Sequence, residues 1–398
     1  MEKYLAKLPI EREKIQKYME VISKYSFALG LFIELTIVLL DKSEYIIQYE
    51  GQWFRITFLL FGLSIVTTKR DLKQWIWFVV FAVIGFISYR ATGRNEILRW
   101  AAFVWACYGK DMKKAMKYTF WYTALGCGII IFLSVMGIYG KIALETIYRA
   151  DLNGVNAVLE NRFCFGMGHP NALHCMILVI TWIGIYCYHE KIKWYGYILI
   201  MIIHIITYLF TDSRTGLLMS IGSVVIFGVL QYVKCLQNSK WTYIGGMAVV
   251  AGCVVLSVLF AVYCTEIPLF DKLNNVLNGR IFALMDSNRY EGMIHTWTLW
   301  SAPINNFYFD LGIVRFFYWF GIIPGMIYYF LQCRVLWCGY KNKDYMLLAM
   351  IVVITVYSVF EAHFISDYIG RNYIFFFFGM YLADMVGDGR KNLNIKKN

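Results

Sequence analysis

Long apolar runs, each about as long as a membrane is thick, recur along almost the whole chain. Most hold roughly 16–24 residues, the fourth being shorter, and charged segments separate them. A helix rises about 1.5 Å per residue, so a run of this length crosses a hydrocarbon layer about 30 Å thick. The pattern predicts twelve membrane-spanning helices, at residues 23–41, 53–68, 74–89, 96–109, 117–139, 170–188, 192–210, 215–233, 242–263, 310–335, 345–360 and 372–386.

The composition excludes an ordinary soluble domain. Of the 398 residues, 59% are hydrophobic and only 16% are charged, whereas a soluble domain is about 45–50% apolar and about 25% charged. No stretch is long and polar enough to form a separate soluble domain. We expect an all-α fold in which residues 21–388 form a single polytopic membrane helix bundle, with long outer loops at 140–169 and 264–309.

Both ends of the chain are charged. Residues 1–20 lack the order of charged start, apolar core and small residues that marks a cleaved signal peptide. Their apolar positions suit a short amphipathic segment on the cytoplasmic membrane surface. Residues 389–398 form a basic tail, which we also place in the cytoplasm.

Lysine and arginine are unevenly distributed between alternate connecting segments. With the N-terminus inside and twelve spans, the inner segments hold 24 of the 38 Lys and Arg residues. Positive residues favour the cytoplasmic side of a membrane protein. The distribution predicts a multi-pass protein of the cell membrane with both termini in the cytoplasm.

Lysine and arginine also differ in the side of the membrane to which the predicted topology assigns them. The inner side holds 20 Lys and 4 Arg, and the outer side holds 3 Lys and 11 Arg. Arg carries a planar fork suited to phosphate and carboxylate, and outer cations oppose the topology bias, so the set favours an outward-facing anion site. The alternative for any single Arg is a lipid headgroup, or a salt bridge to an acid such as Glu96, Asp151 or Glu160. The outer arginines are Arg55, Arg90, Arg94, Arg99, Arg149, Arg162, Arg214, Arg280, Arg289, Arg315 and Arg371.

Each long outer loop contains a stretch, at 142–152 and at 269–285, where apolar residues recur at steps of three and four. This spacing predicts short helices. We expect them to lie on the outer surface and cover a cavity, because loops this long usually have a role. A plain connecting loop is the alternative.

Polar residues precede three helices that start at the outer face. Span six follows His169-Pro170-Asn171, span eight follows TDSRTG with its Arg214, and span ten begins near Asp310. Helix N-termini carry unpaired N–H groups and a partial positive charge, so several aimed at one cavity make a receptor for phosphate. The alternative for His169 and Asn171 is a structural cap or backbone bond, and for Arg214 a salt bridge.

Further candidates follow along the chain. Arg280 lies in the second outer loop, where a lipid headgroup anchor is the alternative role. Asp310, His295 and Glu361 are able to accept a proton, and for each the alternative is a structural cap or hydrogen bond. The ten cysteines form no CxxC pair and the six histidines form no clustered ligand pattern, so we expect no metal and no cofactor.

Two motif blocks resemble those of a known family. RFCFGMGHPNALH, which contains Arg162, and the later TDSRTG each open a predicted membrane helix. In order and type they are similar to blocks of the O-antigen ligase and polysaccharide polymerase superfamily. NGRIFALMD, DLGIVRFFYWFG and FEAHFISDYIGRNYIFF are similar to its later segments. The similar pieces extend over about residues 85–375.

The resemblance implies a metal-independent glycosyltransferase with a glycosyltransferase-C-like fold of many membrane helices. Members transfer glycan from an undecaprenyl-diphosphate carrier on the outer face. Ligases send it to another acceptor, and polymerases send it to the next lipid-linked repeat unit. The family arginines that hold the diphosphate correspond here to Arg162, Arg214 and Arg280. The Asp-Asn-Ser-Tyr…Gly segment of the family survives only as Asp310 and Gly321.

The proton acceptor departs from the family pattern. No residue matches the outer-loop His that ligases use as a base, and His295 lies outside a matching motif. We therefore expect a polymerase of lipid-linked repeat units, with a ligase as the alternative. The acceptor hydroxyl would attack the anomeric carbon, the arginines would stabilise the departing diphosphate, and Asp310, or else His295 or Glu361, would take the proton.

A transporter or flippase of anionic lipid-linked sugars is the competing class. Transporters often show internal repeats and charges at the membrane midplane. The chain shows no convincing repeat, and few charges lie within the spans, Glu34 being an exception. The expected partners are the undecaprenyl-diphosphate-linked oligosaccharide and membrane lipids, with no nucleic acid. The sequence leaves open whether a flippase or a chain-length regulator acts with the protein.

Overall fold

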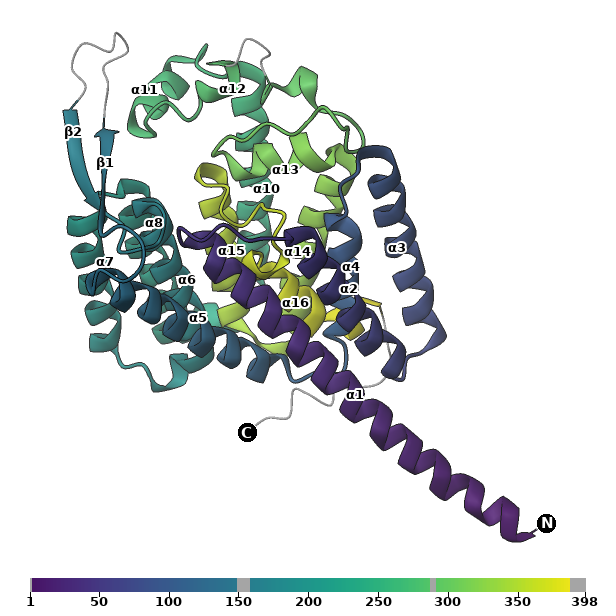
Figure 1. Ribbon diagram of the computed structural model, residues 1–398. Coiled ribbons are helices and arrows are strands. Elements are labelled where there is room, and N and C mark those ends of the chain that lie inside the picture. The colour runs from purple at the N-terminus through teal and green to yellow at the C-terminus, as the bar shows by residue number, and fades with distance from the viewer. Residues whose placement is uncertain (1, 149–157, 287–290, 387–398) are drawn as a thin grey trace. The chain divides into compact units, whose positions relative to one another are not determined.

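The computed structural model (Figure 1) describes residues 2–148, 158–286 and 291–386. Nearly all regular structure within these residues is helical. Contacts between Cα atoms divide the chain into two compact units. The first unit comprises Met1–Ile37, Ile47–Met112 and Tyr368–Asn398, and the second comprises Val38–Ile46 and Lys113–Asp367.

Seven helices within the described part of the chain are long and apolar enough to cross a membrane. Each coincides with a predicted apolar run. The other runs form helices that are shorter or less apolar, so the predicted helical fold is confirmed at this coarser level. The seven are Glu13–Lys42, Leu72–Thr92, Met112–Val135, Pro170–Lys191, Trp194–Thr211, Arg214–Tyr232 and Lys240–Tyr263.

In the first unit, α4 is central, and nearly all its residues are buried. Helix α3 approaches it closely at Gly85, where a Cβ atom would lie 2.7 Å from the Leu98 backbone. Helix α4 has 11 residues, about 16 Å of rise, which is too short to cross a membrane alone. The elements of this unit are α1 (Glu2–Lys42) except its last turn, α2 (Glu50–Thr67), α3 (Leu72–Thr92), α4 (Glu96–Ala106), η3 (Ile369–Arg371), α16 (Ile374–Met380) and α17 (Leu382–Val386).

The second unit contains most of the helices and both long loops that are predicted to face outward, 140–169 and 264–309. Besides the last turn of α1, its helices are α5 (Met112–Val135), α6 (Pro170–Tyr188), η1 (His189–Lys191), α7 (Trp194–Thr211), α8 (Arg214–Tyr232), α9 (Lys234–Gln237), α10 (Lys240–Tyr263), α11 (Pro268–Val276), α12 (Ala283–Asp286), η2 (Ile294–Thr296), α13 (Gly312–Phe320), α14 (Ile322–Asn342) and α15 (Tyr345–Phe360).

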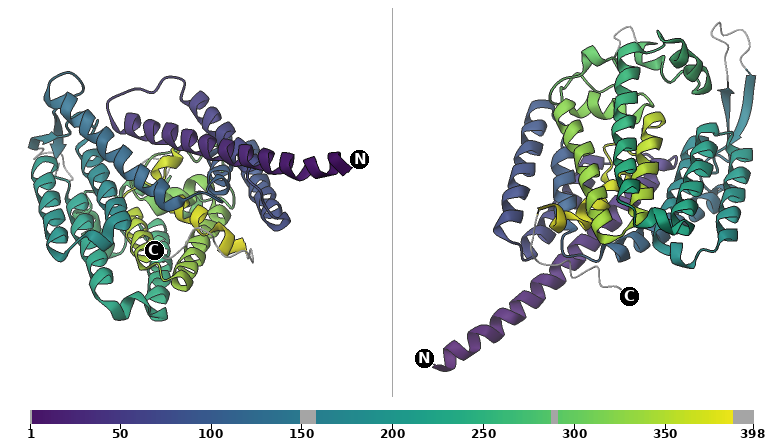
Figure 2. Two further views of the ribbon diagram at one scale, coloured as in Figure 1. Left: turned by 90° about the horizontal axis from the view of Figure 1, so that it is seen from below. Right: turned by 180° about the vertical axis from the view of Figure 1, so that it is seen from behind.

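Helix α15 forms the centre of the second unit. It is apolar on all sides and most of its side chains are buried, which is the pattern of an interior helix. It packs against α8, α10 and α14 (Figure 2). Helices α6, α7 and α8 pack against one another, so the two helices that follow the motif blocks, α6 and α8, are neighbours.

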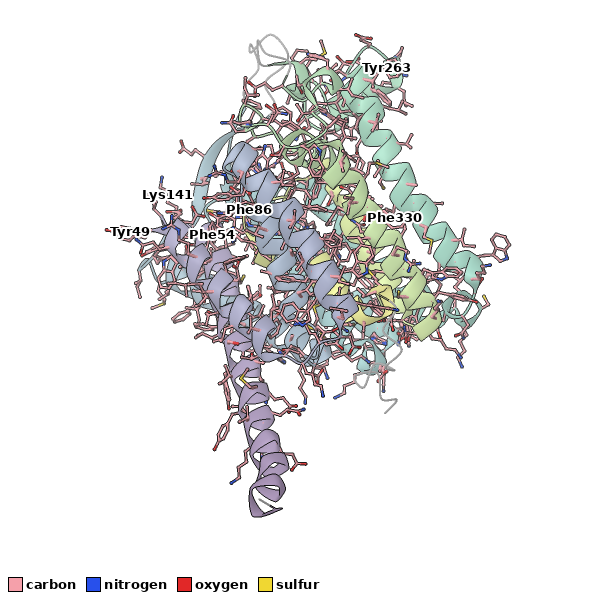
Figure 3. All side chains as sticks on the ribbon, turned by 90° about the vertical axis from the view of Figure 1, so that its right-hand side faces the viewer. Tyr49, Phe54, Phe86, Lys141, Tyr263 and Phe330 are labelled. Atoms are coloured by element: carbon pink, nitrogen blue, oxygen red, sulfur yellow. The ribbon has the colours of Figure 1, made fainter. Side chains whose placement is uncertain are left out.

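Large apolar side chains lie on the surface of the long helices of both units. Phe86 on α3 is 53% exposed and Phe330 on α14 is 62% exposed (Figure 3). Long helices with many exposed apolar side chains are unusual in soluble proteins. Such a surface suits contact with lipid.

The predicted tenth span is broken at Gly321, between α13 and α14. Gly321 has φ of 92°, and a Cβ atom there would lie 2.5 Å from the Cα atom of Trp300. Directly after the break, the N–H of Ile322 donates a hydrogen bond to the carbonyl oxygen of Thr298 at 2.9 Å. Glycine thus lets the preceding loop lie directly on the break and pair with the start of α14.

The first long loop contains a β-hairpin where the sequence predicted a helix at 142–152. Strands β1 (Ala143–Tyr148) and β2 (Val158–Phe163) pair antiparallel, with Leu144 opposite Arg162. The prediction is wrong for residues 143–148 because a strand depends on a partner from another segment, which a local pattern does not reveal. Residues 149–152 lie outside the described residues.

The second long loop carries helices where they were predicted. Helices α11 and α12 fall within or beside residues 269–285, and η2 follows them. Pro268 occupies the first position of α11, where its missing N–H needs no partner. The hairpin and helices α11 and α12 lie at the same end of the second unit (Figure 1), as expected if both loops face one side of a membrane.

Candidate functional site

The two motif blocks are joined by Arg162. Its Nε donates to the carbonyl oxygen of Thr211 at 2.7 Å, and its Nη2 donates to Oδ1 of Asn171 at 2.9 Å. Arg162 lies near the end of β2 and is only 7% exposed. One guanidinium therefore ties the hairpin to the end of α7 and to the start of α6.

His169 caps α6, as predicted. Its Nδ1 accepts a hydrogen bond from the backbone N–H of Asn171 at 3.1 Å, and Pro170 is the first helical residue. Partial burial and the nearby charge of Arg162 lower the pKa of His169. The ring is thus neutral at pH 7. Because Nδ1 accepts, we assign the proton to Nε2.

His174 ties the start of α6 to the corner between α7 and α8. Its ring nitrogens lie 3.3 Å from the hydroxyls of Thr211 and Ser220. Gly216 lies against the ring, and a Cβ atom there would be 2.7 Å from the ring carbon Cγ of His174. The two motif blocks, RFCFGMGHPNALH and TDSRTG, therefore pack directly against each other, although most of α6 and α7 lies between them in the sequence.

Arg214 is the first residue of α8, and its side chain is exposed. It lies three positions after Thr211, the residue that accepts from Arg162. Arg162 is held inside this corner, whereas Arg214 lies on its surface, where it is accessible to a ligand.

Arg280 holds two carboxylates. Its Nε lies 3.0 Å from Oδ2 of Asp310, and its Nη1 lies 2.7 Å from Oε1 of Glu361. Its Nη1 also donates to the carbonyl oxygen of Phe360 at 2.9 Å. The side chain of Asp310 is 55% exposed, that of Glu361 14% and that of Arg280 13%. Arg280 and Glu361 are therefore mostly buried, whereas the carboxylate of Asp310 is accessible.

The environment of this group sets its protonation. Burial raises the pKa of Glu361, and the charge of Asp310 adds to this, although Arg280 opposes it. Burial alone would lower the pKa of Arg280, but the charges of Glu361 and Asp310 outweigh it and raise the pKa. Arg280 thus stays charged, and Glu361 is a stronger proton acceptor than an ordinary carboxylate.

Electrostatics join the Arg280 group to the start of α6. The charges of Asp310 and Arg280 both act on His169, as does that of Lys42 at the end of α1. The backbone of α1 reaches this point, because a Cβ atom at Gly168 would lie 3.1 Å from the carbonyl oxygen of Ser43. Two clusters predicted separately thus belong to one charged site in the second unit.

Lys42 and Arg315 belong to this site but were not among the predicted site residues. Lys42 lies within electrostatic range of Glu361. Arg315, on α13, lies within electrostatic range of Asp310 and Glu361 and donates from Nε to the carbonyl oxygen of Phe309 at 3.0 Å. The only sequence signal for them was that both are cations in segments predicted to face outward.

His295 lies in the second long loop and Asp310 lies near the start of α13. His295 is exposed in η2, on a segment that Trp297 anchors by stacking on Phe317, with ring centroids 5.0 Å apart. Helix α13 begins at Gly312, so Asp310 precedes the helix and pairs with Arg280 instead of capping it.

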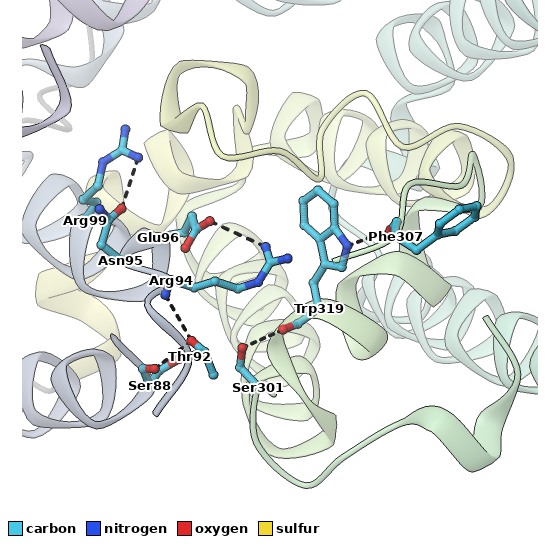
Figure 4. Close-up of polar contacts among 9 residues, drawn as sticks. All are labelled: Ser88, Thr92, Arg94, Asn95, Glu96, Arg99, Ser301, Phe307 and Trp319. Atoms are coloured by element: carbon cyan, nitrogen blue, oxygen red, sulfur yellow. Dashed lines mark hydrogen bonds and ion pairs between the residues drawn. The ribbon is translucent and has the colours of Figure 1, made fainter. Parts of the chain in front are cut away.

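Two predicted outer arginines form salt bridges within the first unit instead. Arg94 pairs with Glu96 at 3.7 Å, and Arg99 bonds Asn95 (Figure 4). The Arg99 side chain also lies 3.6 Å from Glu34. For these two residues the salt-bridge alternative is confirmed. Arg149 and Arg289 lie outside the described residues.

No group of three or more His, Cys, Asp or Glu side chains within the described residues is arranged to hold a metal ion. The charged site consists of cations and two carboxylates, Asp310 and Glu361, which both pair with Arg280. Its cations are Lys42, Arg162, Arg280 and Arg315, with Arg214 exposed at the neighbouring corner. Such a site can bind an anion and accept a proton beside it.

No protein-family model, curated protein or solved structure matches this chain. Fold and site together define a class: a largely helical protein with membrane-length helices and a mixed cationic and carboxylate site beside its two long loops.

Proposed function

We propose that this protein is a polysaccharide polymerase of the cell membrane. It would transfer glycan from an undecaprenyl-diphosphate carrier to a sugar hydroxyl of the next lipid-linked repeat unit, on the outer face. The finer topology is part of the proposal: twelve spans, with the shorter helices completing the bundle and both termini in the cytoplasm.

One observation carries the proposal. The residues that resemble the family's motifs come from five separate segments. Arg162 joins two of these segments by hydrogen bonds and Arg280 joins the other three by ion pairs. The charges of Arg162, Arg280 and Asp310 all act on His169. Residues scattered along a chain are rarely gathered by chance around buried arginines, because burying a charge is costly unless it is paired or used. A diphosphate carries the negative charge that such a site suits.

Each residue has a chemical role in the proposed transfer. The acceptor oxygen attacks the anomeric carbon, the bond from that carbon to the phosphate oxygen breaks, and the diphosphate leaves with the electron pair. Arg214, Arg162 and Arg280 stabilise the departing charge, together with the N-terminus of α6. Arg162 acts partly by holding Thr211 and Asn171 in place.

The acceptor's proton goes to a carboxylate of the Arg280 group. Asp310 is the favoured acceptor because it is half exposed and reachable by substrate. Glu361 is more buried, with a raised pKa, and would receive the proton directly or hold Arg280 in position. The exposed place of His295 in η2 makes it the weakest of the three candidates.

The test is deletion of the gene in its host, with lipid-linked oligosaccharides and surface glycan sized on a gel. We expect single repeat units in place of a polymer ladder, restored by wild type and not by Arg214→Ala. Because Arg214 is exposed, its loss should leave folding intact. Arg90→Ala is the matched control, since Arg90 is also exposed and predicted to face outward but belongs to the first unit.

Other outcomes identify the alternative functions. Full-length polymer left on its lipid carrier would indicate a ligase. Repeat units trapped on the cytoplasmic side would indicate a transporter and would reject the catalytic roles assigned here.

A further inference from the structure

The segment that leads into Asp310 is fixed in place although it has no regular secondary structure. Residues 301–309 are tied to α13 by hydrogen bonds. Ser301 Oγ donates to the carbonyl oxygen of Trp319 at 2.7 Å, and the indole N–H of Trp319 donates to the carbonyl oxygen of Phe307 at 2.9 Å (Figure 4). Asn305 Nδ2 donates to the carbonyl oxygen of Tyr318 at 2.9 Å. The side chains of this segment are therefore presented from a rigid support.

Tyr308 presents an aromatic ring from this support. The guanidinium of Arg315 lies over the ring, 5.1 Å from the ring centroid, and the ring of Trp319 lies perpendicular to it, with centroids 4.9 Å apart at 85°. Arg315 in turn lies 5.0 Å from the ring of Trp319. Tyr308 is nevertheless 63% exposed. Its ring is thus positioned on one side and accessible on the other.

Tyr308 lies beside the carboxylate of Asp310. The two residues flank Phe309, which is 5% exposed, so both face outward from the same short segment. Arg315 lies within electrostatic range of both. Asp310 is held from its other side by Arg280 at 3.0 Å. An exposed ring and an accessible carboxylate are therefore fixed relative to each other.

This combination suits a sugar. The C–H groups on one face of a pyranose ring carry partial positive charge and pack on the negative face of an aromatic ring, while the hydroxyls at the sugar's edge bond to polar groups. A rigid aromatic side chain binds at a low cost in conformational entropy.

We propose that Tyr308 forms the acceptor subsite, stacking on the terminal sugar of the acceptor glycan so that one of its hydroxyls meets Asp310. This inference rests on the proposed function, because it assigns the acceptor side of that reaction. It also separates the two substrates: the arginines bind the donor diphosphate, and Tyr308 binds the terminal sugar of the acceptor. An aromatic residue that merely anchors the loop at the membrane surface would have no effect on acceptor affinity.

The experiment uses the full-length protein in detergent or nanodiscs. The donor is radiolabelled undecaprenyl-diphosphate-linked repeat unit, extracted from cells that lack the gene. The acceptor is the free repeat-unit oligosaccharide, released from the carrier by mild acid and therefore without a diphosphate. Initial rates are measured against acceptor concentration at fixed donor, and then against donor at fixed acceptor.

Tyr308→Ala should raise the KM for the free oligosaccharide about tenfold, equivalent to about 1.4 kcal/mol, and leave the KM for the donor within about twofold. Tyr308→Phe and Tyr308→Trp keep an aromatic face and should retain near wild-type acceptor KM. Tyr308→Leu keeps apolar bulk without that face and should behave like Tyr308→Ala. Phe307→Ala is the matched control, because Phe307 is also exposed and its carbonyl, not its ring, accepts from Trp319.

The outcomes separate this inference from the function on which it rests. If wild type forms product and Tyr308→Leu and Tyr308→Ala keep the wild-type acceptor KM, the subsite is wrong and the polymerase stands. If Phe307→Ala raises the acceptor KM as much as Tyr308→Ala, the effect belongs to the loop and the subsite is also rejected. If wild type joins no repeat units under any condition, the polymerase itself is rejected, and the acceptor subsite with it.

Discussion

At Arg280, one guanidinium holds two carboxylates that come from segments far apart in the chain, Asp310 and Glu361. The planar fork makes this possible, because it donates in two directions at once. Lys carries a similar charge but only as a point, so it cannot reproduce the arrangement.

Arg280→Lys should therefore lower kcat by about tenfold to a hundredfold while the protein still folds. Removal of one donor that stabilises developing negative charge typically costs 10²–10³ in kcat, and Lys restores part of it. Arg280→Ala is less informative, because it leaves Glu361 buried without its partner, which destabilises the fold. The measurement is polymer formation per unit of folded protein, with Arg90→Lys as the control. Wild-type kcat in Arg280→Lys would show that bidentate geometry is not needed.

The raised pKa of Glu361 predicts a pH dependence. A carboxyl group whose pKa lies above the ordinary 4.5 takes up its proton at higher pH than usual. Protonation removes the charge that holds Arg280 in position, and it prevents Glu361 itself from accepting a proton. Activity should therefore fall as the pH decreases through a value above 4.5, and should be retained on the alkaline side of that value.

The check is kcat measured from pH 4 to pH 8 in wild type and in Glu361→Gln. The variant should be slower and should lose this acid limb, because Gln does not titrate. An identical acid limb in both proteins would assign it to another group, and Asp310→Asn would then be the next variant to measure.

At the scale of elements, the corner between α7 and α8 depends on close packing at Gly216. A Cβ atom there would lie 2.7 Å from Cγ of His174 and 2.8 Å from Oγ of Ser213. The same corner supplies the Thr211 carbonyl to Arg162 and places Arg214 at the start of α8. A small change in this packing therefore reaches both arginines.

Gly216→Ala should destabilise the protein by about 1–3 kcal/mol, the usual cost of overpacking, and should lower activity. Gly222→Ala is the control on the same helix, because nothing lies within 4 Å of a Cβ atom there, so Ala should be neutral or stabilising by up to about 1 kcal/mol. Thermal unfolding is monitored by size-exclusion chromatography of heated samples, and polymer formation is measured for the same variants. Equal unfolding temperatures for the two variants would show that the corner accommodates a side chain.

At the scale of the whole molecule, the separation of Lys from Arg predicts the orientation. The hairpin and helices α11 and α12 lie at the same end of the second unit (Figure 1), and the predicted inner segments carry most of the lysines. A single orientation of the second unit in the membrane would therefore place both long loops on the outer side.

Reporter fusions test that orientation. Green fluorescent protein fused after Asn238 should fluoresce, and alkaline phosphatase fused after Val276 should be active, because the first junction is predicted inside and the second outside. Alkaline phosphatase activity at Asn238 together with fluorescence at Val276 would invert the topology and place the charged site in the cytoplasm, which contradicts the proposed donor side.

The sequence alone determined where most helices lie and that many are long and apolar enough for a membrane. Each predicted run coincides with one or two helices, because a long apolar segment satisfies its backbone through its own helical hydrogen bonds, which is a local property. The cap at His169 and the helices of the second outer loop were readable for the same reason.

Only the tertiary structure decided what depends on distant partners. The β-hairpin needs two strands, the break at Gly321 is shaped by Trp300, and Arg280 finds Glu361 about eighty residues further on. Lys42 joins the charged site because α1 ends against the loop before His169, a contact that hydropathy cannot encode. A local pattern shows which residues prefer burial or a helix, but which charges meet is set by how the elements pack.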